Sequence, residues 1–173
     1  MSVISCNLAA ESLNLNLGKM LSEAEISLYD ITIFPDGRNL PPGAGTAPQG
    51  NKLYKAQCSH CHGARGIEGP AARLAGSSGW FSFTDPLRIL RIKEFPILLI
   101  SVGDLWPHAT SVFDYIRRAM PHYAPKSLSN EQVYSLTAYI LYLNDIIKNE
   151  DIVNQKTLPK IVMPAQQRSV TAW

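Results

Sequence analysis

The chain has 173 residues, of which 46% are hydrophobic and 17% are charged. This length fits one globular domain with extensions, which can bury about 70% of the surface of its unfolded chain and needs no disulfide bonds for stability. The 16 basic and 14 acidic residues leave a formal charge of +2, and the basic residues are scattered, so the sequence argues against nucleic acid as a partner.

Residues 1–45 are predicted to form an arm and a linker rather than a domain. Ser22 and Glu25 stand three positions apart, as in a capping box, and predict a short helix. The β-branched and aromatic run 31–34 favours an extended chain. Residues 40–45 are rich in proline and glycine, which is typical of a linker. The arm has too few apolar residues for a core of its own.

A domain over residues 46–148 is predicted to begin with a helix. Thr46 fits an N-cap and Pro48 fits the first turn, and we expect this helix to end near Gln57. Gly50 lacks a side chain, so a second helix can approach closely at that position.

The motif CSHCH at residues 58–62 follows directly. Two thiols at this spacing can each bond to one porphyrin, and the histidine after them can bind the iron, which is the attachment pattern of c-type haem. The sequence therefore predicts one covalent haem c on Cys58 and Cys61, with His62 as an axial ligand. A structural zinc site or a disulfide is the alternative. Zinc sites usually draw on a second pair of ligands, and the remaining cysteine is Cys6.

Thr110 can cap a helix that ends at Met120 and Pro121, where the chain turns inward. A methionine followed by proline, downstream of the motif and just before the last helix, resembles the distal ligand of class I cytochromes, and this resemblance implies Met120 as the second axial ligand. His122 and Met163 are the alternatives. A thioether ligand raises the reduction potential of a haem, whereas a second histidine lowers it.

With both axial positions filled, the iron suits one-electron transfer. A haem enzyme or a gas sensor would need an open or displaceable position.

The last predicted helix has the strongest pattern in the chain. Ser129 and Gln132 form a second capping box, and apolar residues follow at three- and four-residue spacing as far as Ile147. Residues 149–173 are predicted to form a tail. The apolar residues of its part 156–173 lack helical periodicity, so we expect that part to lie extended over another surface, with disorder as the alternative.

This order of features resembles a class I cytochrome c. The resemblance implies an all-α fold, here with an extended N-terminal arm and a C-terminal tail. In that family a proline after the motif offers its carbonyl to the axial histidine, which implies this role for Pro70, with an ordinary turn as the alternative. Trp106 and either Arg117 or Arg118 are candidates to donate to the haem propionates. A core tryptophan and a solvated arginine pair are the alternatives.

A closer resemblance extends over residues 20–166. The strings WPHAT from Trp106, FDYIRRAMP from Phe113 and LTAYILYLN from Leu136 look like the haem subunit of bacterial Sox-type sulfite and sulfane dehydrogenases. The chain departs from that family at His108, where tyrosine is frequent, and it lacks the second haem domain of some members.

The closer resemblance implies an electron-transfer subunit that is not an enzyme on its own. Such a subunit accepts electrons from a molybdopterin-containing sulfur dehydrogenase subunit and passes them to a downstream acceptor, a cytochrome c or an oxidase. A free periplasmic electron shuttle between other redox proteins is the alternative.

A periplasmic location is predicted, because haem is attached to such motifs after export. Met1–Ala10 has neither a basic start nor an apolar h-region, so we expect the export signal to be absent from this sequence. Val3–Cys6 looks like the end of a lipoprotein signal, which would make Cys6 a lipid anchor, although we favour an idle thiol. The apolar run Ile97–Ile100, the candidate considered for a membrane span, is far shorter than the ~18 residues that such a span needs.

Overall fold

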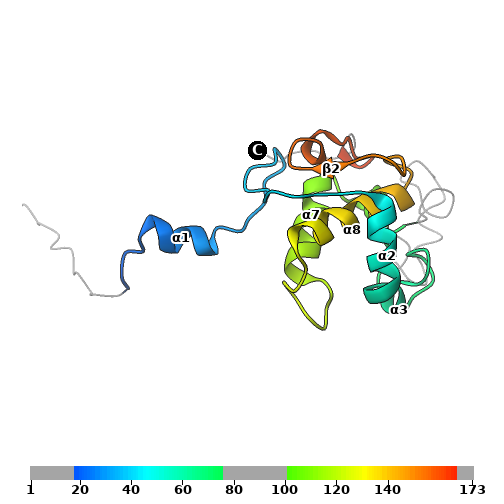
Figure 1. Cartoon of the computed structure of the whole chain (residues 1–173), viewed down its shortest axis with the longest axis horizontal. Helices are drawn as coiled ribbons and strands as arrows, with labels where there is room; N and C mark the ends of the chain where they lie inside the picture. The colour runs from blue at the N-terminus through cyan, green and yellow to red at the C-terminus, as the bar shows by residue number, and fades with distance from the viewer. Residues whose placement is uncertain (1–17, 76–100, 167–173) are drawn as a thin grey trace, which may run out of the picture. The chain divides into compact units, whose positions relative to one another are not determined.

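The computed structural model describes residues 18–75 and 101–166 (Figure 1). The predictions for Cys6, for Ile97–Ile100 and for residues 167–173 lie outside this part of the chain. The chain divides into two compact units, residues 1–31 and 32–173, which we describe separately.

The first unit contains helix α1 (Glu23–Tyr29) and confirms the predicted capping box. The Oγ of Ser22 accepts a bond from the Glu25 backbone N–H at 3.3 Å, and the Glu25 carboxylate accepts one from the Ser22 N–H at 2.8 Å. No residue of α1 is buried. Among the described residues of this unit, five large apolar side chains are exposed: Met20, Leu21, Ile26, Leu28 and Tyr29.

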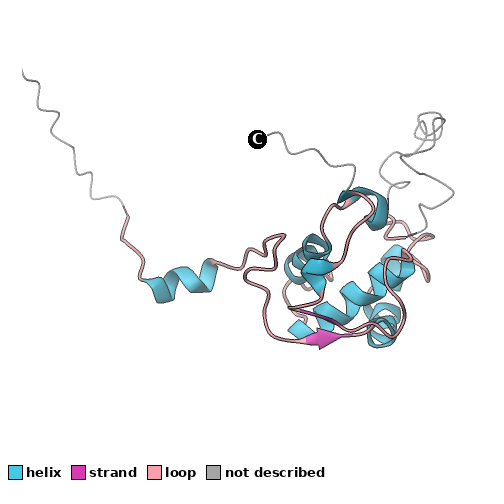
Figure 2. Ribbon diagram, turned by 90° about the horizontal axis from the view of Figure 1, so that it is seen from above, coloured by secondary structure: helices cyan, strands magenta, loops and turns pink. Residues whose placement is uncertain are grey.

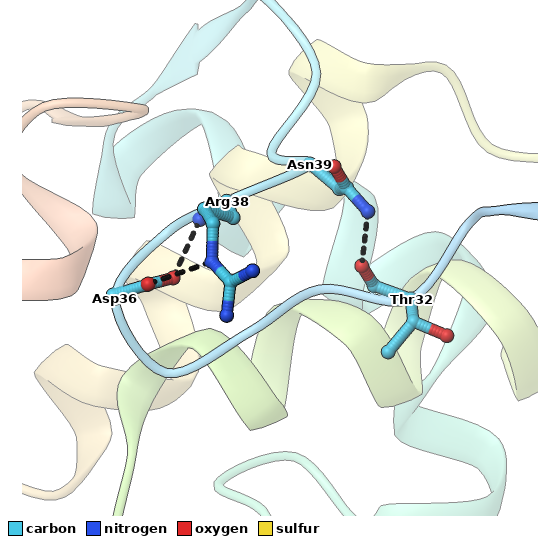
Figure 3. A network of polar contacts seen from close by, with 4 residues as sticks. All are labelled: Thr32, Asp36, Arg38 and Asn39. Carbon is cyan, nitrogen blue, oxygen red and sulfur yellow. Dashed lines mark hydrogen bonds and ion pairs between the residues drawn. The ribbon is translucent and has the colours of Figure 1, made fainter. Parts of the chain in front are cut away.

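The second unit opens with a turn held by polar contacts (Figure 3). Asp36 accepts bonds from the Arg38 backbone N–H at 2.9 Å and from Arg38 Nε at 2.8 Å. The guanidinium also lies 4.1 Å from the centre of the Phe34 ring. Asn39 Nδ2 donates to the Thr32 carbonyl at 3.0 Å, which closes the base of the turn.

Residues 32–45, which the sequence assigned to the arm and linker, pack against the core of this unit. Ile33 and Leu40 are buried in the core. Strand β1 (Ala44–Gly45) pairs antiparallel with β2 (Val153–Asn154), and Figure 2 shows this short ribbon beside the helices.

Three longer helices form the centre of the second unit: α2 (Ala47–Gln57), α7 (Ala109–Ala119) and α8 (Asn130–Leu143). α8 contacts both α2 and α7, so it is the central helix. A Cβ on Gly50 would overlap the Ser135 carbonyl oxygen, which explains why this crossing of α2 and α8 needs glycine. Shorter turns complete the described elements: α3 (Ser59–His62), α6 (Val102–Leu105) and the 3-10 helix η1 (Leu158–Lys160). The predicted all-α fold is confirmed.

Two predicted helix boundaries were wrong. The N-cap of α7 is His108, and Thr110 lies buried inside the first turn. α8 ends at Leu143 rather than Ile147, because Asn144 caps it. The start of α7 differs by two residues, which is within the usual variation of helix ends. At Asn144, hydrogen bonds to Leu74, Ser101 and Gly103 accompany the end of the helix.

The described part of the tail packs on its own unit, which differs from the expectation that it lies over another surface. Leu158 and Met163 are fully buried in the core, and β2 extends the pairing with β1. His108 and Val162 form a further antiparallel bridge. The tail lacks helical periodicity, as the sequence indicated. An extended segment can, however, bury alternate side chains within its own domain as well as on a partner.

Candidate haem-binding site

The CSHCH motif occupies a sharp junction between α2 and α3. Cys58 is both the C-cap of α2 and the N-cap of α3, and Cys61 and His62 lie in the single turn of α3. The His62 N–H donates to the Cys58 carbonyl at 3.0 Å. Gly63 ends the turn with a φ of 81°, which glycine adopts without strain.

Cys58, Cys61 and His62 all line one cavity of about 640 Å³. Such a volume is ordinary for a site that holds a cofactor. The wall is mostly apolar and is contributed by the loop after α3 and by α6, α7 and α8, with these aliphatic residues: Leu74, Val102, Val112, Ile116, Leu136 and Ile140. A large apolar cavity with two thiols, an imidazole and a thioether on its wall fits a haem group.

The Nδ1 of His62 lies 2.8 Å from the carbonyl oxygen of Ala72, which corrects the prediction for Pro70. Pro70 is exposed. The Ala71 N–H donates to the Cys61 carbonyl at 2.9 Å, and this bond holds the loop where the Ala72 carbonyl reaches the imidazole. In a neutral ring this bond makes Nδ1 the donor and leaves Nε2 available as a metal ligand.

Tyr54 supports the motif from α2, a role that the sequence reasoning missed. Its hydroxyl donates to the Gly63 carbonyl at 2.8 Å, and its fully buried ring lies 5.1 Å from that of Tyr139. Burial raises the pKa of Tyr54 well above its ordinary value, so the hydroxyl keeps its proton at neutral pH. In the sequence, this role could have been inferred from an aromatic residue one helical turn before the motif.

The structure separates the candidates for the second axial ligand. Met120 follows the last residue of α7, is partly buried, and lines the cavity together with His122. Met163 is fully buried in the core and does not line the cavity. Two of the three candidates thus reach the site.

Trp106 also lines the cavity and packs edge-to-face on Tyr115, with ring centres 5.4 Å apart. Neither Arg117 nor Arg118 is among the lining residues. Arg118 pairs with Asp114 at 2.8 Å, so the structure does not bring the predicted arginines to the site. Arg73, which the sequence reasoning did not single out, lines the cavity instead.

No disulfide joins Cys58 to Cys61. Cys61 is exposed, whereas Cys58 is partly buried. Burial, and to a lesser degree the electrostatic effect of the neighbouring Cys61, raise the pKa of Cys58 to about 11. Within residues 18–75 and 101–166 no group of three or more histidine, cysteine, aspartate or glutamate side chains could hold a metal ion. The zinc alternative therefore finds no ligand set in that part of the chain.

No helix within the described ranges is long and apolar enough to cross a membrane.

Comparison with solved structures finds a similar fold in the crystal structure of the sulfane dehydrogenase SoxCD from Paracoccus pantotrophus. The two chains are 29% identical, with a TM-score of 0.74, over 90% of this chain and 71% of that chain. A comparison with curated proteins gives no match. The sequence model of the family described as cytochrome C oxidase, cbb3-type, subunit III matches residues 45–140. Since this match covers more than half of the chain, the protein belongs to that family of cytochrome c domains.

Proposed function

We propose that the chain is a mono-haem electron-transfer subunit of a sulfur-compound dehydrogenase. The observation that carries the proposal is the single apolar cavity that collects Cys58, Cys61 and His62 from α3 and Met120 from the end of α7. A haem c bound there supplies one-electron transfer at its iron.

Each of the cavity residues has its own role in holding the haem. Cys58 and Cys61 would hold a haem covalently through their sulfur atoms, and His62 and Met120 would bind its iron. The Ala72 carbonyl keeps a proton on His62 Nδ1 and orients the imidazole. The apolar wall limits the access of water, which raises the reduction potential.

Covalent attachment is tested by expression with a haem-maturation system and denaturing gel electrophoresis. The band of the wild-type protein should keep a haem peroxidase stain, and Cys58→Ala combined with Cys61→Ala should lose it. A stain that persists in the double variant would exclude covalent attachment at this motif.

A sulfur dehydrogenase partner is supported by the similarity to SoxCD over most of this chain. The resemblance to Sox-type haem subunits adds a molybdopterin-containing subunit as the electron donor and a cytochrome c or an oxidase as the downstream acceptor. The periplasm is the matching location. Haem reduction should then require both the catalytic subunit and a sulfur substrate.

The first unit supplies the docking segment in this proposal. Its exposed apolar residues include Ile26 at 50% and Leu28 at 74%, and α1 buries none of its residues within this chain. Covering such side chains removes apolar area from water at about 25 cal/mol per Å². The described part of the tail, by contrast, buries Leu158 and Met163 in the core of its own unit.

The partner is tested with Ile26→Asp combined with Leu28→Asp, co-expressed with a molybdenum dehydrogenase subunit. The double variant should purify without that subunit and lose substrate-dependent haem reduction, while its haem spectrum stays that of the wild type. Ile152→Asp, which changes another exposed apolar residue, is the matched control and should keep the complex. A wild-type protein that runs as a monomer beside the subunit and is not reduced by it would favour the free shuttle.

A further inference from the structure

Asn144 stands directly after α8 and makes four hydrogen bonds with its side-chain amide. Its Nδ2 donates to the carbonyls of Leu74 and Ile140, each at 2.8 Å. Its Oδ1 accepts from Ser101 Oγ at 3.1 Å and from the Gly103 N–H at 3.3 Å. Two carbonyl partners and two donor partners fix the orientation of the amide. Every donor of the group and both of its acceptor positions are used.

These bonds join two parts of the cavity wall that lie far apart in the sequence. Leu74 belongs to the loop after the CSHCH motif, whereas Ser101 caps the N-terminus of α6. Both residues line the cavity, and so do the α6 residues Val102 and Leu105 and the adjoining Trp106. Asn144 itself is not a lining residue, so it can act on the site only through these partners.

The contact between Asn144 and α6 is close-packed. A Cβ on Gly103 would come within 2.7 Å of Asn144 Oδ1, a separation too short for a carbon atom. Ser101 is 1% exposed, and Gly103 is also buried, so water does not replace the amide in these bonds. The position of α6 therefore depends on Asn144.

We propose that Asn144 is a positioning residue for the haem: by holding Leu74 and α6 together, it keeps water away from the cavity and so sets the reduction potential. This inference rests on the haem assigned in the proposed function. Ferric haem carries one more positive charge than ferrous haem, so admitted water stabilises the ferric state more and lowers the potential. A simple helix cap would affect stability alone.

Three uncharged variants test this inference through the midpoint potential of the isolated, haem-loaded cytochrome. Asn144→Ala removes all four bonds and should shift the potential downward most. Ser101→Ala removes one bond and should give a smaller downward shift. Gly103→Ala pushes on the same contact from the α6 side and should also lower the potential, although alanine favours helices and would otherwise be neutral or stabilising.

Leu158→Ala is the matched control, because Leu158 is fully buried but does not line the cavity. It should lower the melting temperature and leave the potential unchanged. As a second readout, amide hydrogen exchange at Gly103 should be faster in Asn144→Ala than in the wild type.

If Asn144→Ala and Gly103→Ala keep the wild-type potential while their melting temperatures fall, Asn144 is only a helix cap and the inference is wrong. Should Asn144→Ala fail to fold, Ser101→Ala and Gly103→Ala still decide the question. A chain that takes up no haem would reject the proposed function and this inference with it. Haem-loaded variants with an unchanged potential would reject this inference alone.

Discussion

The environment of His62 is set by backbone atoms rather than by a particular side chain. The acceptor for Nδ1 is the Ala72 carbonyl, which any residue at that position would supply. The path of the loop matters more. A Cβ on Gly69 would overlap the Cys61 carbonyl oxygen, the same atom that accepts the bond from the Ala71 N–H. The tight return of the chain at Gly69 therefore places the acceptor.

Pro70→Ala should leave the haem spectrum and the reduction potential unchanged, because Pro70 is exposed and the bond to His62 is made by the Ala72 carbonyl. Gly69→Ala should lower the yield of haem-loaded protein, since the loop must move away from Cys61 to admit the new carbon atom. Absorbance of haem per unit of protein and a redox titration measure both effects. A potential that shifts in Pro70→Ala but not in Gly69→Ala would return the role to the proline.

Met120→Ala should abolish the weak near-infrared band that reports sulfur bound to ferric haem, because Met120 is the methionine that lines the cavity. Met163→Leu is the control: it conserves side-chain volume in the core, costs less than about 1.5 kcal/mol, and should keep the band. A band that survives in Met120→Ala would exclude Met120 as the ligand. A wild-type spectrum without the band would direct attention to His122, which lines the same cavity.

At the scale of elements, the crossing of α2 and α8 determines the shape of the site. Gly50 lets the α8 backbone approach at Ser135, and Tyr54, one turn further along α2, packs on Tyr139. Tyr54 then reaches the Gly63 carbonyl just beyond the motif. The close packing of α2 on α8 therefore also fixes the position of Tyr54, which holds the end of α3.

Gly50→Ala should destabilise the protein by about 1–3 kcal/mol, because the added methyl group forces α2 and α8 apart, although alanine is the better helix former. Denaturant unfolding followed by circular dichroism measures the change. Lys52→Ala, at an exposed position of the same helix, should stay within about 0.5 kcal/mol of the wild type. A Gly50→Ala protein as stable as the wild type would contradict the close packing.

At the scale of the whole second unit, segments from before α2 and after α8 close around the helices. Ile33 and Leu40 enter the core from one side of the sequence, and Val153, Leu158 and Met163 enter it from the other. The tail is therefore part of the fold.

A chain truncated after Asp151 should lose cooperative unfolding or melt far below the wild type. The truncation removes β2 and three fully buried apolar side chains, Val153, Leu158 and Met163, and the loss of a buried leucine or methionine side chain alone costs about 2–5 kcal/mol. Val162→Asp is the comparison, since Val162 is 63% exposed and the change should have little effect. If the truncated chain melts at the wild-type temperature, the tail serves a partner instead.

The sequence predicted what depends on local chemistry. The capping boxes at Ser22 and Ser129 and the bounds of α2 from Thr46 to Gln57 are confirmed. The all-α fold and the resemblance to cytochrome c are confirmed by the structure and by the family match. The roles of the haem ligands stay predictions.

What the sequence could not reveal depends on residues that meet across the fold. Ala72 rather than Pro70 faces His62, because the loop is shaped by contacts with Cys61. The partners of Asn144 are 41 and 70 positions away for Gly103 and Leu74, and no local pattern indicates them.

The pairing of β1 with β2 also affects the order in which the protein can fold. Ala44 pairs with Asn154, so this contact closes a loop that contains every helix from α2 to α8. Contacts between such distant residues form late, because the chain must first lose the entropy of the whole loop. During synthesis the CSHCH motif emerges well before the segment that completes the core. The two cysteines therefore stay accessible for an interval before the core is closed.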